Sequence, residues 1–231
     1  MNGFFSLLGE PGLHHTLGLT ASVALAALLL HALCGLLLGY LLAKPAWRGR
    51  ALLDSVVTLP LVFPPMATGF LLLMLFGRRG PLGAPLHDWL GIDLVFSFWG
   101  LLLAAFISGL PLVVKPVQSA FENIPRRLAE AARTLGKRES EIFVFVLLPN
   151  VRSALAGGLI LGLGRALGEV GITLMLGGNI EGRTVTASLD IYNAVISGDF
   201  ERAGMLSLIL GGVTVALFTL LRRTSKSPLG W

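Results

Sequence analysis

Arg165 and Glu169 are the only charged residues between positions 153 and 177, inside a long apolar segment. Residues four apart share one face of a helix, so the two side chains can meet. An isolated charge in hydrocarbon costs at least about 2.5 kcal/mol, and we therefore expect them to face one another or the interior of a helix bundle. An arginine also offers charge-assisted hydrogen bonds to a tetrahedral oxyanion, which a nearby carboxylate would repel. The pair predicts part of a closed gate or subunit contact, or else a purely structural ion pair.

The rest of the sequence lacks the patterns of catalysis, metal binding and nucleotide binding. Cys34 is the single cysteine, and the four histidines have no cysteine or carboxylate at ligand spacing. The glycines of residues 162–168 miss the spacing of a dinucleotide site, and with Gly158 they are expected to pack helices closely. The sequence also lacks a stripe of basic residues interleaved with aromatic residues, the pattern that would indicate nucleic-acid binding. We therefore expect no enzyme activity and no cofactor in this chain.

The composition indicates lipid as the solvent. Hydrophobic residues make up 54% of the 231 residues and charged residues 13%, against roughly 25% charged in an average soluble domain. A bilayer core of about 30 Å needs about 20 apolar residues as a helix. The fold class is predicted as all-α, a polytopic transmembrane helix bundle forming a single membrane domain over residues 1–231. Five spans are expected, at Thr16–Ala43, Ser55–Gly77, Leu94–Val114, Val151–Gly177 and Ala203–Leu221.

Residues 1–15 are a separate question. They hold too few consecutive apolar positions for another span, which leaves a sixth, interfacial segment as an open alternative.

The basic residues predict the orientation in the membrane. Thirteen of the 18 fall in the connections around residues 44–50 and 115–152 and in the tail 222–226. Lys and Arg are enriched on the cytoplasmic side of membrane proteins. We therefore expect an inner-membrane protein with its N-terminus outside and its C-terminus in the cytoplasm.

The connection 115–150 is too long for a simple turn and has its own helical pattern. Pro125 suits the first turn of a helix, and apolar residues recur at helical spacing until Gly136 provides a stop. A second helical stretch follows and meets Pro149, which predicts a break before the next span. A short amphipathic surface helix follows from this pattern.

The same connection resembles a known signature. Glu130-Ala131-Ala132, then Gly136, then Val146 and Leu148-Pro149 are similar in register to the EAA loop of permease subunits of bacterial ATP-binding-cassette importers, with Val where Ile is commoner. The resemblance implies a coupling helix that docks on a separate ATPase subunit, which binds the ATP. The alternative is a solvated interfacial helix without a partner. The expected coupling residues are Glu130, Ala131, Ala132, Leu135, Gly136, Leu148 and Pro149.

Further segments narrow the resemblance to molybdate permeases. They are residues 59–65, 77–80, 165–171 and 178–184. Sulfate and tungstate permeases share parts of them. The resemblance implies import of molybdate, with tungstate or sulfate as alternatives. A self-sufficient channel or ion-coupled carrier is a rival of another class, but such carriers often contain inverted repeats, and the sequence contains no convincing duplication.

Prolines mark a candidate pathway. Pro60, Pro64 and Pro65 block a continuous helix, which a membrane tolerates where protein or water satisfies the freed backbone groups. They predict a broken helix beside a pathway or a packed kink. The expected pathway or gate residues are Pro60, Pro64, Pro65, Arg165, Glu169, Thr173 and Asn179.

The resemblance also implies an assembly. Five spans leave little room for a passage in one chain, so two copies are expected to enclose it at their shared interface. The family arrangement adds two ATPase subunits and a periplasmic oxyanion-binding protein. Arg78, Arg79 and Arg183 are expected to contact that protein, unless they are solvated loop charges.

Overall fold

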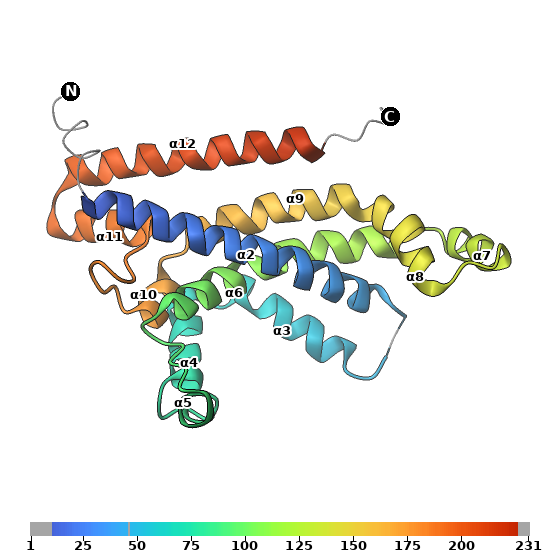
Figure 1. The fold of residues 1–231 in the computed structure, drawn as a ribbon, viewed down its shortest axis with the longest axis horizontal. Coiled ribbons are helices and arrows are strands. Elements are labelled where there is room, and N and C mark those ends of the chain that lie inside the picture. Colours follow the sequence, from blue (N-terminus) through green and yellow to red (C-terminus); the bar gives the residue numbers. More distant parts are fainter. Residues whose placement is uncertain (1–10, 46, 226–231) are drawn as a thin grey trace.

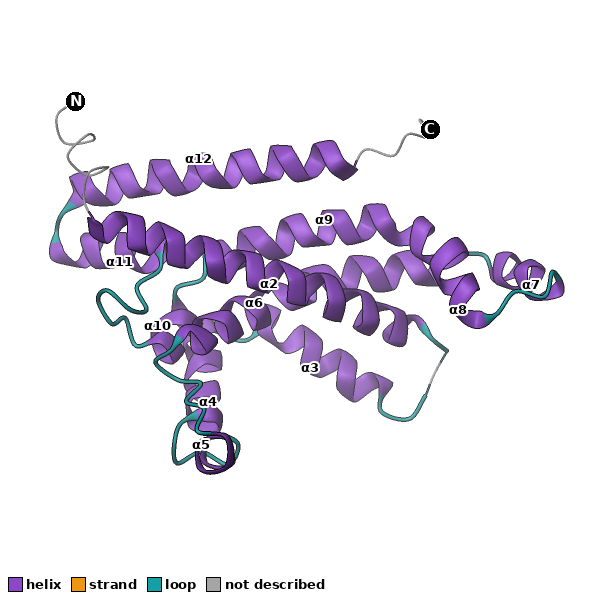
Figure 2. Ribbon diagram, viewed as in Figure 1, coloured by secondary structure: helices purple, strands orange, loops and turns teal. Residues whose placement is uncertain are grey.

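The computed structural model describes residues 11–45 and 47–225, and it describes the side chains of residues 12–45 and 47–219 (Figure 1). Throughout these ranges the ordered elements are helices (Figure 2), which confirms the all-α prediction. In chain order they are α2 (Pro11–Ala43), α3 (Arg50–Val62), α4 (Pro65–Phe76), α5 (Gly83–Leu90), α6 (Phe98–Glu122), α7 (Arg126–Thr134), α8 (Glu139–Ile142), the π-helix η1 (Phe143–Leu147), α9 (Leu148–Leu167), α10 (Gly171–Gly177), α11 (Ala187–Ser197) and α12 (Phe200–Ser225).

The long helices α2, α6, α9 and α12 run beside one another and form the body of the molecule (Figure 1). Among the described residues, four helical segments are long and apolar enough to cross a membrane: 12–43 in α2, Phe98–Glu122, Glu139–Leu167 and Phe200–Thr219. The chain is therefore built as a multi-pass membrane bundle. The predicted N-terminal segment falls mostly on residues 1–10, outside the described residues, while 11–15 belong to α2.

Glycines allow the central helices to touch. A Cβ on Gly158 of α9 would lie 3.0 Å from the Cα of Val113 in α6, and a Cβ on Gly162 would lie 2.8 Å from Val113 Cγ2. Gly35 of α2 meets the same valine from the other side, where a Cβ would come within 2.5 Å of Cγ1. Small residues promote this close approach in lipid. The packing role predicted for Gly158 and Gly162 is confirmed.

The predicted span Ser55–Gly77 is not one continuous helix, and the broken helix that its prolines predicted is present. The segment forms two short helices, α3 and α4, separated at Phe63 and Pro64. Phe63 is extended, with φ −79° and ψ 140°. The residue before a proline avoids the helical region, and Pro64 itself cannot donate a backbone hydrogen bond. As a result α4 and α5 project from the side of the bundle (Figure 1).

The predicted span Val151–Gly177 is also interrupted, because α9 ends at Leu167 and α10 begins at Gly171. The predicted break at Pro149 is absent. Instead α8, η1 and α9 form one helical segment, in which the Leu148 N–H donates to Phe143 O. A π-turn shifts the hydrogen-bond pattern and so accommodates a proline at the next turn.

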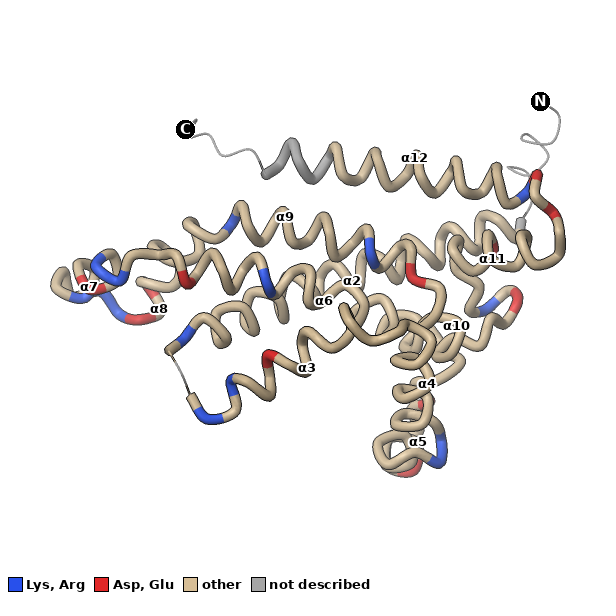
Figure 3. Tube along the Cα trace, turned by 180° about the vertical axis from the view of Figure 1, so that it is seen from behind, with Lys and Arg blue, Asp and Glu red and all other residues tan. Residues whose placement is uncertain are grey.

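The cytoplasmic loop predicted at 115–150 begins later than expected. Helix α6 continues through Lys115 to Glu122 and contains Pro111 and Pro116. Two ion pairs fasten α3 to this extension: Lys115 with Asp54, and Arg50 with Glu122 at 2.8 Å. Charged residues gather around this end of the bundle, near α7 and α8 (Figure 3).

Candidate functional site

The two helix breaks meet in space. A Cβ added to Gly171, at the start of α10, would lie 2.9 Å from Pro65 Cβ and 3.1 Å from the Met66 backbone nitrogen. One turn further, a Cβ on Gly69 of α4 would lie 2.9 Å from the Ile172 Cα. Helices α4 and α10 therefore cross with their backbones in contact, directly after the point where each span is interrupted.

Glu169 lies in the break between α9 and α10. Its side chain is 1% exposed, and its Oε1 accepts a 2.8 Å hydrogen bond from the Ile172 N–H in the first turn of α10. Its Oε2 lies 2.5 Å from Arg165 Nη1, an ion pair without hydrogen-bond alignment. The prediction that the two side chains face one another is confirmed. The prediction that they share one helix is wrong, because α9 ends before Glu169.

This geometry gives the two charges different surroundings. The Arg165 side chain is 31% exposed, whereas the carboxylate is enclosed. A buried carboxylate needs a compensating charge and hydrogen bonds, and Glu169 receives both. Because the Arg165 side chain is partly exposed, its remaining guanidinium donors are able to bind an anion or an acceptor on another chain.

Thr173 lies one turn after Glu169 and is buried. Both residues line a cavity of about 20 Å³ together with Thr20 and Thr186, a volume that suits a single water molecule. The Thr20 hydroxyl accepts a 2.9 Å hydrogen bond from the Ala187 N–H and so ties α2 to α11. Sequence reasoning missed Thr20, because one threonine in a long apolar helix carries no spacing signal.

Asn179 and Pro60 are not brought to the Arg165–Glu169 pair. Asn179 follows α10 with φ +52° and exchanges two side-chain hydrogen bonds with Asn193 of α11, at 2.7 and 3.0 Å. Pro60 lies inside α3, one turn before the break. Of the predicted pathway residues, Pro64, Pro65, Arg165, Glu169 and Thr173 surround the α4–α10 crossing.

The three predicted contact arginines separate into two groups. Arg78 donates from Nε and Nη2 to the two carboxylate oxygens of Asp93, at 3.0 and 2.6 Å. This hydrogen bonding from Arg78 is the main cause that lowers the pKa of Asp93. Arg78 and Arg183 line a cavity of about 490 Å³ beside the start of α6, but Arg79 does not.

Helix α7 carries the predicted coupling residues Glu130, Ala131 and Ala132, and it ends at Thr134, just before Leu135 and Gly136, as the sequence indicates. Gly136 has φ +76°, its N–H donates to Arg133 O, and the Lys137 N–H donates to Ala132 O. These bonds are the Schellman pattern that a C-terminal glycine favours.

The predicted coupling residues differ in their exposure. Glu130 and Ala131 are exposed, and Leu135 is 80% exposed, whereas Ala132 is 9% exposed and packs against its own chain. Leu148 and Pro149 belong to the first turn of α9.

Salt bridges brace α7 against α8. Arg133 donates from Nε and Nη2 to the two oxygens of Glu139, at 2.6 and 3.1 Å. The hydrogen bond from Arg133 is also the main cause that lowers the pKa of Glu139. Lys137 forms a 3.0 Å ion pair with Glu141. Because α8 continues through η1 into α9, α7 is joined to the helical segment that ends just before Glu169.

Sequence reasoning also missed a buried histidine. His31 of α2 is fully buried, its Nε2 lies 2.8 Å from Phe106 O, and its ring stacks on Phe106 with centroids 5.4 Å apart. The ion pairs of Arg50 and Asp54 escaped notice because their partners lie 72 and 61 residues away.

Comparison with known proteins agrees with this architecture. Residues 35–225 match the family described as binding-protein-dependent transport system inner membrane component. The chain is 37% identical to the molybdenum transport system permease protein ModB of Escherichia coli over 216 residues, covering 92% of this chain and 94% of that protein. It is 31% identical to the sulfate transport system permease protein CysW of Synechococcus elongatus, covering 95% of this chain and 77% of that protein.

Solved structures share the fold. A bacterial ABC transporter involved in the import of the acidic polysaccharide alginate superposes with a TM-score of 0.77 at 18% identity, covering 97% of this chain and 82% of that one. A structure of a bacterial alginate transporter in complex with its alginate-bound periplasmic protein gives the same TM-score. The chain therefore belongs to the family of binding-protein-dependent transport system inner membrane components, as a multi-pass permease of the ABC importer type.

Proposed function

We propose that this chain is the permease of an ATP-driven molybdate importer, in which a separate subunit binds and hydrolyses the ATP. The observation that carries the proposal is α7, a surface helix with exposed Glu130, Ala131 and Leu135 that is braced on the chain's own α8. The molybdenum permeases of Escherichia coli and Haemophilus influenzae, 37% and 34% identical over more than nine-tenths of this chain, support molybdate as the substrate.

The contacts of α7 provide a route for force. Closure of the ATPase subunits on ATP would move α7, and the Arg133–Glu139 pair would pass the movement to the segment Glu139–Leu167. That segment ends beside Glu169, whose carboxylate holds the first turn of α10. Since α10 crosses α4 at Gly69 and Pro65, a movement of α9 reaches both helix breaks. Such rigid shifts of packed helices are a common form of alternating access.

A second copy of the chain completes the proposed passage. Large apolar side chains on α3 and α4 are exposed in the single chain, including Leu52 and Val62 on α3 and Phe70 and Met74 on α4. Val62, beside the helix break, is 83% exposed. A group of exposed large apolar side chains marks an interface or a lipid contact. We assign it to a two-fold dimer contact that places the proline breaks along the shared passage.

The orientation and the remaining partner follow the charge distribution. The α7 end faces the cytoplasm and the α11 end faces the periplasm, which puts Arg78 and Arg183 on the side where an oxyanion-binding protein delivers its load. A reporter fused after Trp231 is expected to be active as a cytoplasmic fusion, and a periplasmic signal would overturn this orientation.

Transport by reconstituted vesicles tests the substrate. Vesicles containing this chain, its ATPase and its binding protein are expected to accumulate labelled molybdate only with internal ATP. Adding an excess of unlabelled tungstate or sulfate shows how strongly each anion competes with labelled molybdate for uptake. Sulfate is the second candidate because CysW is 31% identical to this chain, and stronger competition by sulfate than by unlabelled molybdate would favour it. Uptake without ATP would indicate a carrier or channel instead.

A further inference from the structure

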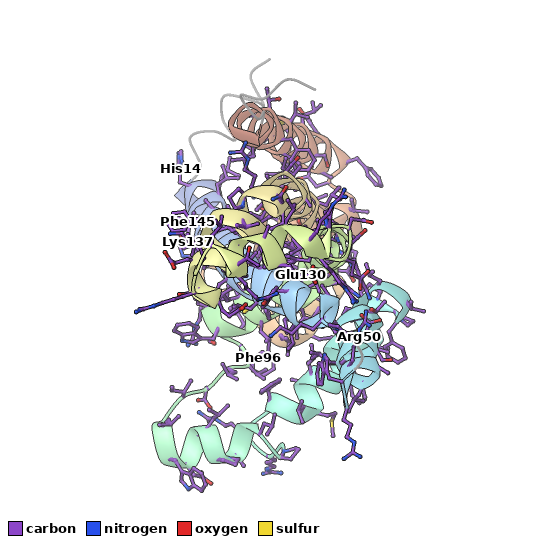
Figure 4. All side chains as sticks on the ribbon, turned by 90° about the vertical axis from the view of Figure 1, so that its right-hand side faces the viewer. His14, Arg50, Phe96, Glu130, Lys137 and Phe145 are labelled. Carbon is purple, nitrogen blue, oxygen red and sulfur yellow. The ribbon has the colours of Figure 1, made fainter. Side chains whose placement is uncertain are left out.

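A cavity of about 500 Å³ lies behind α7, where the ends of α2 and α6 meet the start of α3. Figure 4 faces this end of the molecule and labels Arg50 of α3 and Glu130 of α7, two residues of the cavity lining. Part of its lining, the apolar wall, includes Tyr40, Phe121 and Leu147. The rest, the charged wall, adjoins it where Lys44 lies over the Tyr40 ring, so the cavity is amphipathic.

The charged wall has an excess of cations. Lys44, Arg50, Arg126 and Arg133 line it, against the carboxylates of Glu122 and Glu130. Two of the cations are already neutralised, since Arg50 pairs with Glu122 at 2.8 Å and Arg133 pairs with Glu139 outside the cavity at 2.6 Å.

The other two cations remain available. Among the residues that the structure describes, neither Lys44 nor Arg126 has a carboxylate within ion-pair distance; the Lys44 ammonium lies over the Tyr40 ring, 4.7 Å from its centroid. Among the described lining residues, Glu130 is the one carboxylate that forms no ion pair. It can offset only one of the two cations, Lys44 and Arg126, so the wall keeps an excess of positive charge.

The cavity lies where the membrane boundary is expected. Tyr40 is in the last turn of α2, and Trp47 follows in the next connection, with its Nε1–H donating to Leu41 O. Tyrosine and tryptophan concentrate at the level of the lipid headgroups. We therefore expect the cavity to lie near the level of the lipid headgroups, within reach of the start of the acyl chains.

We infer that this cavity binds the headgroup of an anionic phospholipid, with its phosphodiester between Lys44 and Arg126 and the start of its acyl chains against Tyr40 and Phe121. Basic pockets between helices on the cytoplasmic side favour anionic lipids. A small inorganic anion would leave most of the volume and the whole apolar wall unfilled, and a zwitterionic headgroup would gain nothing from the uncompensated cations. A lipid bound here would connect the end of α2 to α7.

Lipid retention by the purified full-length chain tests this inference. Native mass spectrometry in detergent is expected to show one retained phosphatidylglycerol in preference to phosphatidylcholine with identical acyl chains. Lys44→Gln and Arg126→Gln should each reduce retention about fivefold, the loss expected for one basic residue near an anionic lipid surface. Arg48→Gln and Arg127→Gln are matched controls, because these neighbouring cations do not line the cavity, and they should retain the lipid.

The other outcomes contradict the inference. Equal retention of phosphatidylcholine, or an equal loss in the control variants, would show that the cavity does not select the headgroup. Displacement of the lipid by inorganic phosphate at millimolar concentration would identify a free-anion site instead. The measurement needs no ATPase and no transport, so a failure here leaves the proposed import function untouched, and a failure of import leaves this site untouched.

Discussion

Pro65 packs against Gly171, so that the first residue after one helix break touches the first residue after the other, with only 2.9 Å between Pro65 Cβ and a Cβ built on the glycine. The contact joins α4 to α10 and places both interruptions beside the buried carboxylate of Glu169. A movement of either α4 or α10 must therefore shift the other helix.

Gly69→Ala is expected to destabilise the protein. Its new Cβ would lie 2.9 Å from the Ile172 Cα, a backbone atom that cannot turn away. Overpacking of this kind costs typically about 1–3 kcal/mol. Gly157→Ala is the control, because a Cβ there meets nothing within 4 Å. Thermal denaturation in detergent should show a lower midpoint for Gly69→Ala and no loss for Gly157→Ala; equal midpoints would disprove the close crossing.

Pro64→Ala with Pro65→Ala is expected to lower uptake while the protein level in the membrane stays normal. Both prolines lie at the break beside the proposed passage, and alanine would allow α3 to continue toward α4. Pro60→Ala, one turn earlier inside α3, should have a smaller effect. Immunoblotting and uptake of labelled molybdate distinguish a pathway role of the prolines from a packed kink. A lower protein level with normal uptake per molecule would mean a packed kink without a pathway role.

The Arg165–Glu169 pair predicts unequal effects of single neutralisation. Arg165→Gln leaves a buried carboxylate without its counter-charge. Breaking a fully buried ion pair lowers the free energy of unfolding by about 3–5 kcal/mol. Because Arg165 is partly exposed, we expect about half of that loss. Glu169→Gln keeps an acceptor for the Ile172 N–H and should fold better. Protein level should recover in the double variant. If both single variants kept full uptake, the pair would have no gating role.

Removing the ion pair between Arg133 and Glu139 is expected to uncouple ATP hydrolysis from transport. Glu139→Gln removes the charge that holds α7 on α8, so ATP hydrolysis by the assembled transporter should continue while uptake falls. The exchange Arg133→Glu with Glu139→Arg should restore part of the uptake. Glu141→Gln, which breaks the neighbouring pair with Lys137, is the control. The quantity to measure is molybdate transported per ATP hydrolysed, and an unchanged ratio in Glu139→Gln would contradict the proposed route.

The same brace has a predictable pH dependence. Hydrogen bonding from Arg133 lowers the pKa of Glu139 below its ordinary value of 4.5. A carboxyl group with a lowered pKa stabilises the fold above its ordinary pKa and loses this contribution as pH falls through the lowered value. The difference in thermal midpoint between wild type and Glu139→Gln should therefore be constant above about pH 5 and disappear in stronger acid. A difference that grew on acidification would have the wrong sign.

Local spacing was enough to predict part of this structure. Long uncharged runs located α2, α6 and α12, and the recurrence of Leu128, Ala131 and Leu135 before Gly136 predicted α7 and its stop. Each of these depends on neighbours within a turn or two, or on hydrophobicity averaged over a span. The meeting of Arg165 and Glu169 was predictable for the same reason, because four residues separate them.

Spacing did not predict features that depend on distant partners or on an uncommon local hydrogen-bond pattern. Lys115 looked like the start of a loop, but its partner Asp54 lies 61 residues away and α6 continues past it. Pro149 looked like a break, but a π-turn absorbs it. The interruption at residues 168–170 contains no proline that would predict it. It lies directly before Gly171, which contacts Pro65 of another helix, and the sequence does not show that contact.

An ATPase is proposed to drive this chain through α7, and the variant Ala131→Arg probes that contact. Ala131 is exposed on α7, so the bulky charge should leave the fold and its thermal midpoint unchanged while blocking contact with the ATPase. In vesicles with the ATPase and binding protein, ATP-driven uptake of labelled molybdate should be abolished in this variant. Wild-type uptake in Ala131→Arg would contradict the account.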